Sequence, residues 1–151
     1  MVTRLSGSRL LYIGIAGIIL VLVLLGIRAQ RPQKVSISVG SAEVAVTVAD
    51  TSESRTSGLS FRDKLGANEG MLFVFGEDQP YGFWMKDMRF SIDIIWFDAN
   101  RRLVFVKERA EPSSYPAVFI PSTPARYVLE VPAGFFSLHK LKVGDSFEIH
   151  R

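Results

Sequence analysis

The chain has 151 residues, of which 48% are hydrophobic and 22% charged, so it has enough apolar material for a packed core and is not a disordered, highly charged protein. The formal net charge of +3 comes entirely from Arg4, Arg9 and Arg28, because residues 30–151 contain 15 basic and 15 acidic side chains. A neutral body without a basic stripe argues against nucleic acid as a partner.

An uncharged segment near the N-terminus, residues 10–27, has the sequence LLYIGIAGIILVLVLLGI. As a helix its 18 residues would extend about 27 Å, enough to cross the hydrocarbon core of a bilayer. We expect residues 1–9 to be a short basic tail, 10–27 a transmembrane anchor or uncleaved signal, and 28–34 a linker. Residues 35–151 would then form a domain outside the cytoplasm, held at the cytoplasmic membrane by a single span. The alternative is a cleaved signal peptide and an exported soluble domain.

The body begins with two runs, residues 35–39 and 42–48, that alternate around Gly40-Ser41 and predict a β-hairpin. A short polar helix follows, beginning at Asp50 or Thr51 and ending at Gly58, with Asp50 and Glu53 as a capping box. Further strands are expected at 71–75, 81–85, 90–97, 102–107, 118–120, 127–131 and 146–150, and a second helix at 133–140. Eight or nine short strands with one or two short helices predict a mainly β fold, a compact sandwich or a partly open barrel, after the single transmembrane helix.

Several short motifs follow one another along this body. They are Gly58-Leu59 with Arg62, Gly70-Met71-Leu72-Phe73, Phe83-Trp84-Met85-Lys86, Ile92-Asp93-Ile94, Ala110-Glu111-Pro112, Tyr127-Val128-Leu129-Glu130-Val131, Ala133-Gly134 and Gly144-Asp145. In this order they resemble the bacterial and archaeal family called domain of unknown function 192, over about residues 44–149. The resemblance implies a compact, mainly β domain, often exported or membrane-anchored, and no particular activity. Ser60 departs from the family, in which this position is often Met.

The most informative candidate residue is Asp93, within the apolar run 90–97. Strand alternation places it on the same face as Ile95. A buried carboxylate there must meet a cation or backbone donors, because an unpaired buried charge is costly. Arg62 is the expected partner, with Lys86 and Arg89 as alternatives, and the arrangement serves either to lock loops together or to contact a ligand.

Glu130 raises the same question, since it lies within the apolar run 127–131. If Asp93 and Glu130 lined one cavity, two carboxylates could divide acid and base roles, as in a hydrolase acting on sugars. A solvated strand face would explain Glu130 equally well. The chain has no cysteine, and of its two histidines His139 is flanked by lysines and His150 lies at the terminus, so neither predicts a nucleophilic site.

Three methionines, Met71, Met85 and Met88, lie in two neighbouring motifs and define a further alternative. Thioether sulfurs are soft ligands suited to copper, although methionines in a Phe-rich β domain usually fill the core. Classical zinc and calcium motifs are absent from the sequence, and no cofactor is expected.

Taken together, these patterns favour a non-catalytic binding or accessory module over an enzyme, without deciding between them. The candidate cleft contains Arg62, Trp84, Met85, Asp93 and Glu130, and its ligand would be a small molecule, a glycan or a peptide. The hydrolase with Asp93 and Glu130 and the copper binder with the three methionines remain the alternatives.

Overall fold

The structure is a computed structural model that describes residues 34–150. These residues belong to one compact unit, Gln33–Arg151. The expected basic tail, the transmembrane helix at 10–27 and nearly all of the linker lie outside the described residues. Within residues 34–150, no helix combines the length and the apolar character needed to cross a bilayer.

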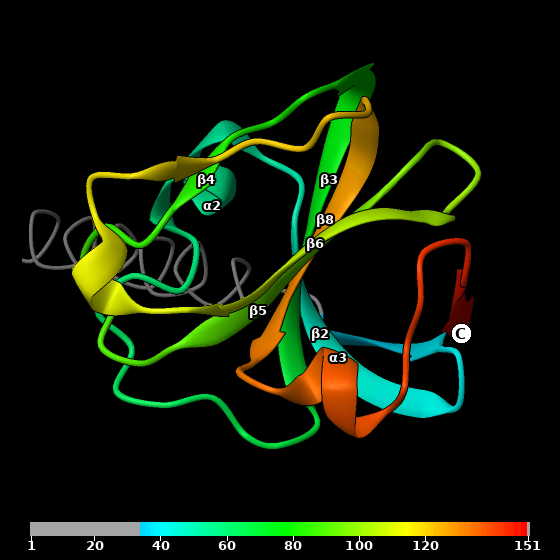
Figure 1. Ribbon diagram of the computed structural model, residues 1–151, viewed down its shortest axis with the longest axis horizontal. Helices are drawn as coiled ribbons and strands as arrows, with labels where there is room; N and C mark the ends of the chain where they lie inside the picture. Colours follow the sequence, from blue (N-terminus) through cyan, green and yellow to red (C-terminus); the bar gives the residue numbers. More distant parts are fainter. Residues whose placement is uncertain (1–33, 151) are drawn as a thin grey trace, which may run out of the picture. The chain divides into compact units, whose positions relative to one another are not determined.

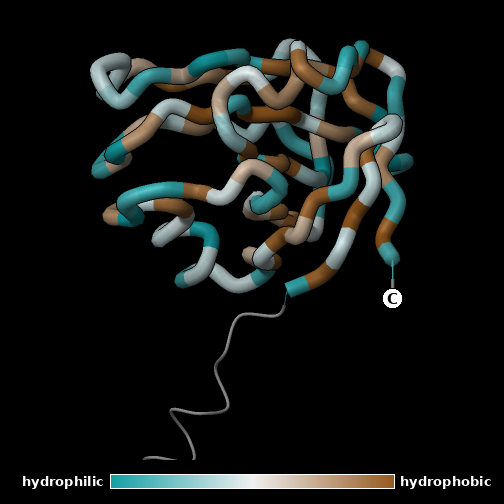
Figure 2. The backbone as a smooth tube through the Cα atoms, turned by 90° about the horizontal axis from the view of Figure 1, so that it is seen from below, coloured by the Kyte–Doolittle hydropathy of each residue, from teal (hydrophilic) through white to brown (hydrophobic). Residues whose placement is uncertain are grey.

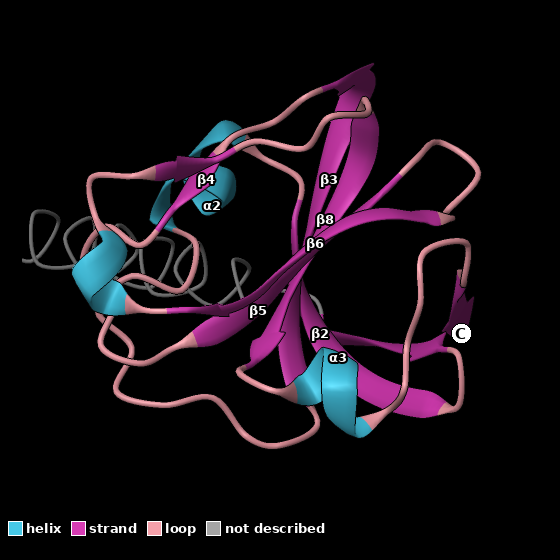
Figure 3. Ribbon diagram, in the orientation of Figure 1, coloured by secondary structure: helices cyan, strands magenta, loops and turns pink. Residues whose placement is uncertain are grey.

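Strands dominate the described part of the chain, and Figure 3 shows the few short helices at the periphery of the body. The elements are β1 (Lys34–Val39), β2 (Ala42–Ala49), α2 (Ser52–Ser57), β3 (Glu69–Gln79), β4 (Phe83–Trp84), β5 (Ile92–Phe97), β6 (Leu103–Ala110), the 3₁₀ helix η1 (Pro112–Ser114), β7 (Val118–Phe119), β8 (Ala125–Pro132), α3 (Phe135–Leu138) and β9 (Phe147–His150). The prediction of a mainly β fold with about nine strands and two short helices is therefore confirmed.

Seven of these strands form one open sheet, in the order β6-β5-β8-β3-β2-β1-β9, and β4 pairs with β7 in a second, two-stranded sheet. The hairpin predicted around Gly40-Ser41 is formed by β1 and β2, with Val39 opposite Ala42. In the large sheet β2 and β3 run parallel, and the other described pairs are antiparallel. A bridge between Arg102 and Ser146 brings the two edges of the large sheet together at one point.

Strand β5 of the large sheet is buried on both faces, and each face of the sheet has its own hydrophobic cluster. One cluster contains Ile37, Leu129 and Phe147, and α3 packs Phe135 into it. The other contains Leu59, Phe73 and Trp96 on the opposite face. Figure 1 shows α2 and β4 on one side of the central strands and α3 on the other. Figure 2 shows the apolar residues recurring along the strands and the polar residues gathering at turns.

Local details differ from the sequence-based expectation at the first helix. The capping box joins Thr51 and Ser54 instead of Asp50 and Glu53: the Ser54 amide donates to Thr51 Oγ1 over 3.1 Å, and the Thr51 amide donates to Ser54 Oγ over 3.0 Å. Thr51 is the last extended residue before the helix, so its side chain is the one placed to accept from the third helical amide.

Candidate functional site

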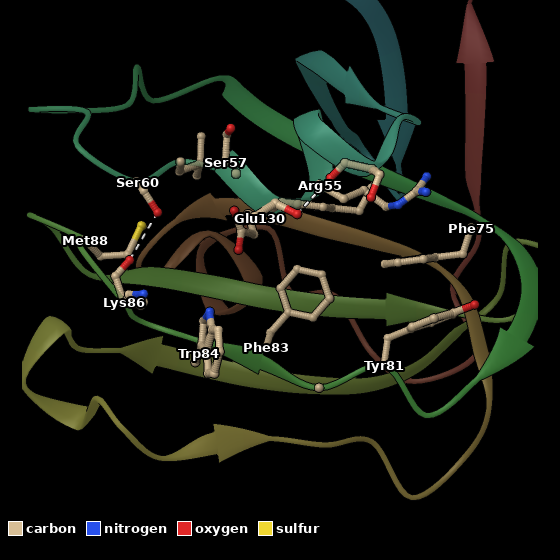
Figure 4. A pocket seen from close by; sticks show the side chains of 16 residues that line it. Arg55, Ser57, Ser60, Phe75, Tyr81, Phe83, Trp84, Lys86, Met88 and Glu130 are labelled. Atoms are coloured by element: carbon tan, nitrogen blue, oxygen red, sulfur yellow. Dashed lines mark hydrogen bonds between the residues drawn. The ribbon is translucent and has the colours of Figure 1, made fainter.

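A cavity of about 340 Å³ lies on the face of the sheet that α2 covers, within the usual range for small-molecule sites. Its walls come from α2 and the loop after it, from β3, from the segment around β4, and from Glu130 on β8. Figure 4 shows the Glu130 side chain pointing into the space between Ser60, Met88 and Lys86 on one side and Phe83 and Trp84 on the other. The cavity therefore combines aromatic rings, hydroxyl groups and one buried carboxyl.

Two loops at this cavity, residues 58–63 and 85–89, are held together by polar contacts. Ser60 Oγ donates to the Lys86 carbonyl over 3.1 Å, and the Phe61 amide donates to the Asp87 carbonyl over 2.9 Å. Phe61 and Asp87 both have positive φ, 62° and 57°, which costs energy for residues other than glycine. Arg89 adds an ion pair to Asp63 in the first loop. These two hydrogen bonds and this ion pair hold the two loops together, and with them one side of the cavity.

Glu130 is the unusual group of the site. Its side chain is 5% exposed, and its Oε2 atom has no hydrogen-bond partner among the described residues. In the strand register Glu130 stands opposite Met71 on β3 and Ile94 on β5, and neither of these side chains has a hydrogen-bond donor. Burial raises the pKa of Glu130 to about 8, so the carboxyl is largely protonated at neutral pH.

Arg62 affects the pKa of Glu130 without forming an ion pair with it. Its positive charge opposes the effect of burial and lowers the pKa of Glu130, yet no carboxylate oxygen within residues 34–150 lies close enough to Arg62 for an ion pair. The sequence-based pairing of Arg62 with Asp93 is wrong, and the charge of Arg62 instead lowers the pKa of Glu130 and that of Glu69.

Asp93 instead binds backbone amides. Its Oδ1 accepts hydrogen bonds from Arg109 over 2.8 Å and Gly134 over 3.0 Å, and its Oδ2 accepts one from Phe136 over 2.9 Å. Asp93 is fully buried, and three donors replace the water that its carboxylate loses. Arg109 and Gly134 both have positive φ, 49° and 88°. Asp93 thus locks the end of β6 to the start of α3 and does not belong to the cavity.

The hydrolase hypothesis required Asp93 and Glu130 to line one cavity, and the structure contradicts this. In the β5–β8 register Asp93 stands opposite Val131, whereas Glu130 stands opposite Ile94. Val131 and Ile94 belong to the two different hydrophobic clusters. The two carboxyl groups therefore leave opposite faces of the same sheet and cannot act on one substrate.

The methionines proposed for copper all belong to the cluster on the cavity side. Met71 and Met85 are buried in it, and Met88 packs against it. Met88 lines the cavity, but Met71 and Met85 do not. Within residues 34–150 no cluster of three His, Asp or Glu side chains could hold a metal ion. Packing accounts for the positions of Met71 and Met85.

Of the five residues expected to form the cleft, Trp84 and Glu130 line the cavity, and Arg62, Met85 and Asp93 do not. Trp84 is 54% exposed, and its neighbour Met85 is buried, as strand alternation predicts. The residues expected from the sequence to form the cleft did not include Ser57, Phe83 or Lys86, which are among the other side chains that line the cavity. The Phe83-Trp84-Met85-Lys86 motif contained the signal for two of them, but only the loop geometry shows which of its side chains face the cavity.

Comparison with solved structures finds similar proteins, of which two are described here. One is a putative transcription regulator from Sinorhizobium meliloti 1021, 28% identical with a TM-score of 0.74; the match covers 78% of this chain and 95% of that one. The other is a protein of unknown function from Novosphingobium aromaticivorans DSM 12444, 28% identical with a TM-score of 0.75, covering 79% of this chain and 87% of that one. The match covers nearly all of the Sinorhizobium chain, so that chain consists almost entirely of a domain similar to this one.

A search of curated proteins finds no match. The family described as "Uncharacterized ACR", domain of unknown function 192, matches residues 35–149, from the first strand to the last. The match includes the loops and strands that form the cavity, and the expectation drawn from the sequence motifs is confirmed: the chain belongs to the domain of unknown function 192 family.

Proposed function

We propose that residues 35–151 form a non-catalytic module that binds a small organic molecule in the cavity at Glu130. The observation that carries this proposal is the Oε2 atom of Glu130, a buried polar atom without a partner in the described part of the chain. Leaving such an atom unpaired costs about 1–3 kcal/mol, and a bound molecule with a complementary group would recover that energy. The size of the cavity and its aromatic wall support the same function.

A thermal-shift panel on residues 30–151 tests this function, with sugars, carboxylates, amines, short peptides and Cu(I) as probes. A molecule that binds the folded state raises the melting temperature. Ser57→Phe should abolish the shift, because Ser57 is exposed at the wall of the cavity and a phenyl ring there would occupy it. Ser41→Phe, at the distant hairpin turn, is the matched control. A shift that survives Ser57→Phe would place the binding elsewhere, and a panel without any shift would contradict the proposal.

We also propose that the module is held outside the cytoplasm by residues 10–27 as a single membrane span. The support is the uncharged sequence of that segment and the three arginines that account for the net charge. The full chain should remain in the membrane fraction after alkaline washing, and a chain that begins at Gln30 should be soluble. Protease added outside intact spheroplasts should digest the body. A full chain that is recovered soluble would indicate signal cleavage or contradict the anchor.

The proposed function does not include nucleic-acid binding, although the Sinorhizobium relative is described as a putative transcription regulator. Residues 30–151 carry equal numbers of basic and acidic side chains. Binding to the phosphate backbone depends on an excess of positive charge along one surface, and this balance gives no support for one.

A further inference from the structure

The charge of the cavity restricts the class of molecule that it accepts. Three ionisable side chains other than tyrosine line it: Arg55, Lys86 and Glu130. Burial keeps Glu130 largely protonated at neutral pH, with a pKa of about 8, so the two cations are not neutralised by it. The side chains that line the cavity therefore carry a net positive charge, which favours anions and disfavours ammonium compounds.

The two cations, Arg55 and Lys86, differ in the contacts that they make. Arg55 Nη1 donates to the carbonyls of Asp50 over 2.6 Å and Val74 over 2.9 Å, and its guanidinium lies 5.4 Å from the centre of the Phe75 ring. These contacts hold the Arg55 side chain in the wall of the cavity. The Lys86 side chain is exposed and makes no ion pair within residues 34–150. Lys86 is the cation free to meet a ligand.

Facing these polar groups is an apolar wall. Phe83 meets Phe73 edge to face, with ring centroids 4.9 Å apart, and Met88 and Leu59 complete the surface. Trp84 lies at the exposed side of the cavity and is in edge contact with Tyr115. An aromatic or aliphatic body bound here would bury apolar area against side chains that are already fixed in place.

We infer that the ligand of this cavity is a small organic carboxylate with an apolar body, its carboxylate held between Lys86 and the Glu130 carboxyl and its body packed against Phe83 and Met88. This inference rests on the proposed function and names the ligand class. Lys86 supplies the charge. The protonated carboxyl of Glu130 donates a hydrogen bond to an oxygen of the ligand. An ionised Glu130 could not donate this bond and would repel the carboxylate of the ligand.

A matched series of probes tests the inference: phenylbutyrate, phenylbutanol and phenylbutylamine, which share one apolar body and differ in charge. Binding is measured by calorimetry on the full chain in nanodiscs of zwitterionic lipid, with empty nanodiscs as the blank. Phenylbutyrate should bind at least tenfold more tightly than the alcohol, and the amine should bind weakest. Equal affinity for the acid and the alcohol, or preference for the amine, overturns the carboxylate inference while the small-molecule function stands.

Lys86→Gln should reduce the preference for the acid over the alcohol about tenfold, because the substitution removes the charge that the acid pairs with. Lys142→Gln, at an exposed lysine outside the cavity, is the control. An unchanged preference in Lys86→Gln overturns the inference. If none of the three probes binds, the inference is overturned as well, and the broader panel on residues 30–151 decides separately whether the cavity binds another class of molecule.

The pH dependence gives a second, independent measurement. Because the pKa of Glu130 is about 8, its carboxyl is mostly protonated at pH 7 and mostly ionised at pH 9, so phenylbutyrate should bind about tenfold more weakly at pH 9. The other charged or titratable groups around Glu130 are Arg62, Arg55, Lys86 and Tyr81, while its neighbours on β3 and β5, Met71 and Ile94, are uncharged.

Glu130→Gln separates Glu130 from those other groups, because glutamine keeps a neutral donor at every pH. In this variant the affinity for phenylbutyrate should be the same at pH 7 and pH 9. A tenfold loss that persists in Glu130→Gln would assign the effect to another group and overturn the role given to Glu130.

Discussion

Asp93 and Glu130 lie on adjacent strands one residue out of register, and their carboxyl groups leave opposite faces of the sheet. On one face Asp93 accepts three backbone hydrogen bonds, which fix the junction of β6 and α3. On the other face Glu130 has an oxygen without a partner in residues 34–150 and lines a cavity. Both acids are buried within apolar strands, yet Asp93 has a structural role and Glu130 has a candidate binding role.

Asp93→Ala should lower the free energy of unfolding by about 3–5 kcal/mol, because three backbone amides lose a charged, buried acceptor at once. Chemical denaturation of residues 30–151 measures the change. Asp78→Asn is the control, since Asp78 forms an exposed ion pair with Arg126, worth about 1 kcal/mol or less. Equal effects of the two substitutions would contradict the role assigned to the three amides.

The contribution of Glu130 to the stability of the domain should fall as the pH rises from about 4.5 to about 8. Over this interval the unfolded chain releases the Glu130 proton, whereas the folded chain retains it because its pKa is raised to about 8. Glu130→Gln removes this contribution, so the variant should gain on the order of 2–4 kcal/mol over the parent between pH 5 and pH 9. Urea melts at both pH values measure the gain, with the exposed Glu43→Gln as the control. A parallel pH dependence in parent and Glu130→Gln would count against a raised pKa.

Arg62→Met should raise the pKa of Glu130 above 8, because the positive charge of Arg62 is what opposes the effect of burial. Carbon-13 NMR titration of the Glu130 carboxyl reports this pKa directly. Lys64→Met, in the same loop and exposed, should leave it unchanged. A lower pKa in Arg62→Met would show that the arginine acts in some other way.

Gly70→Ala should destabilise the domain by about 1–3 kcal/mol through overpacking. A Cβ atom at Gly70 would lie 2.8 Å from the Glu130 backbone oxygen and 3.2 Å from side-chain atoms of Val131 and Val44. Gly76→Ala is a control in the same strand, β3, because a Cβ there meets nothing within 4 Å. Thermal melts compare the two variants, and similar melting temperatures would refute the close approach of β3 and β8 at Gly70.

Much of this protein follows from the sequence by itself. Alternation in residues 35–48 and 92–97 determined the hairpin and the two faces of β5, because side chains on a strand alternate strictly. These are local properties, so a local pattern is enough to predict them.

Only the tertiary structure decided what the two buried acids do. The partners of Asp93 are backbone amides from residues 109, 134 and 136, and an amide leaves no mark in the sequence that distinguishes it from any other. The pairing of β5 with β8 placed Glu130 on the opposite face from Asp93, and that register depends on contacts between segments far apart along the chain. The cavity exists because α2, β3, the β4 segment and β8 meet around Glu130, and no single segment contains that arrangement.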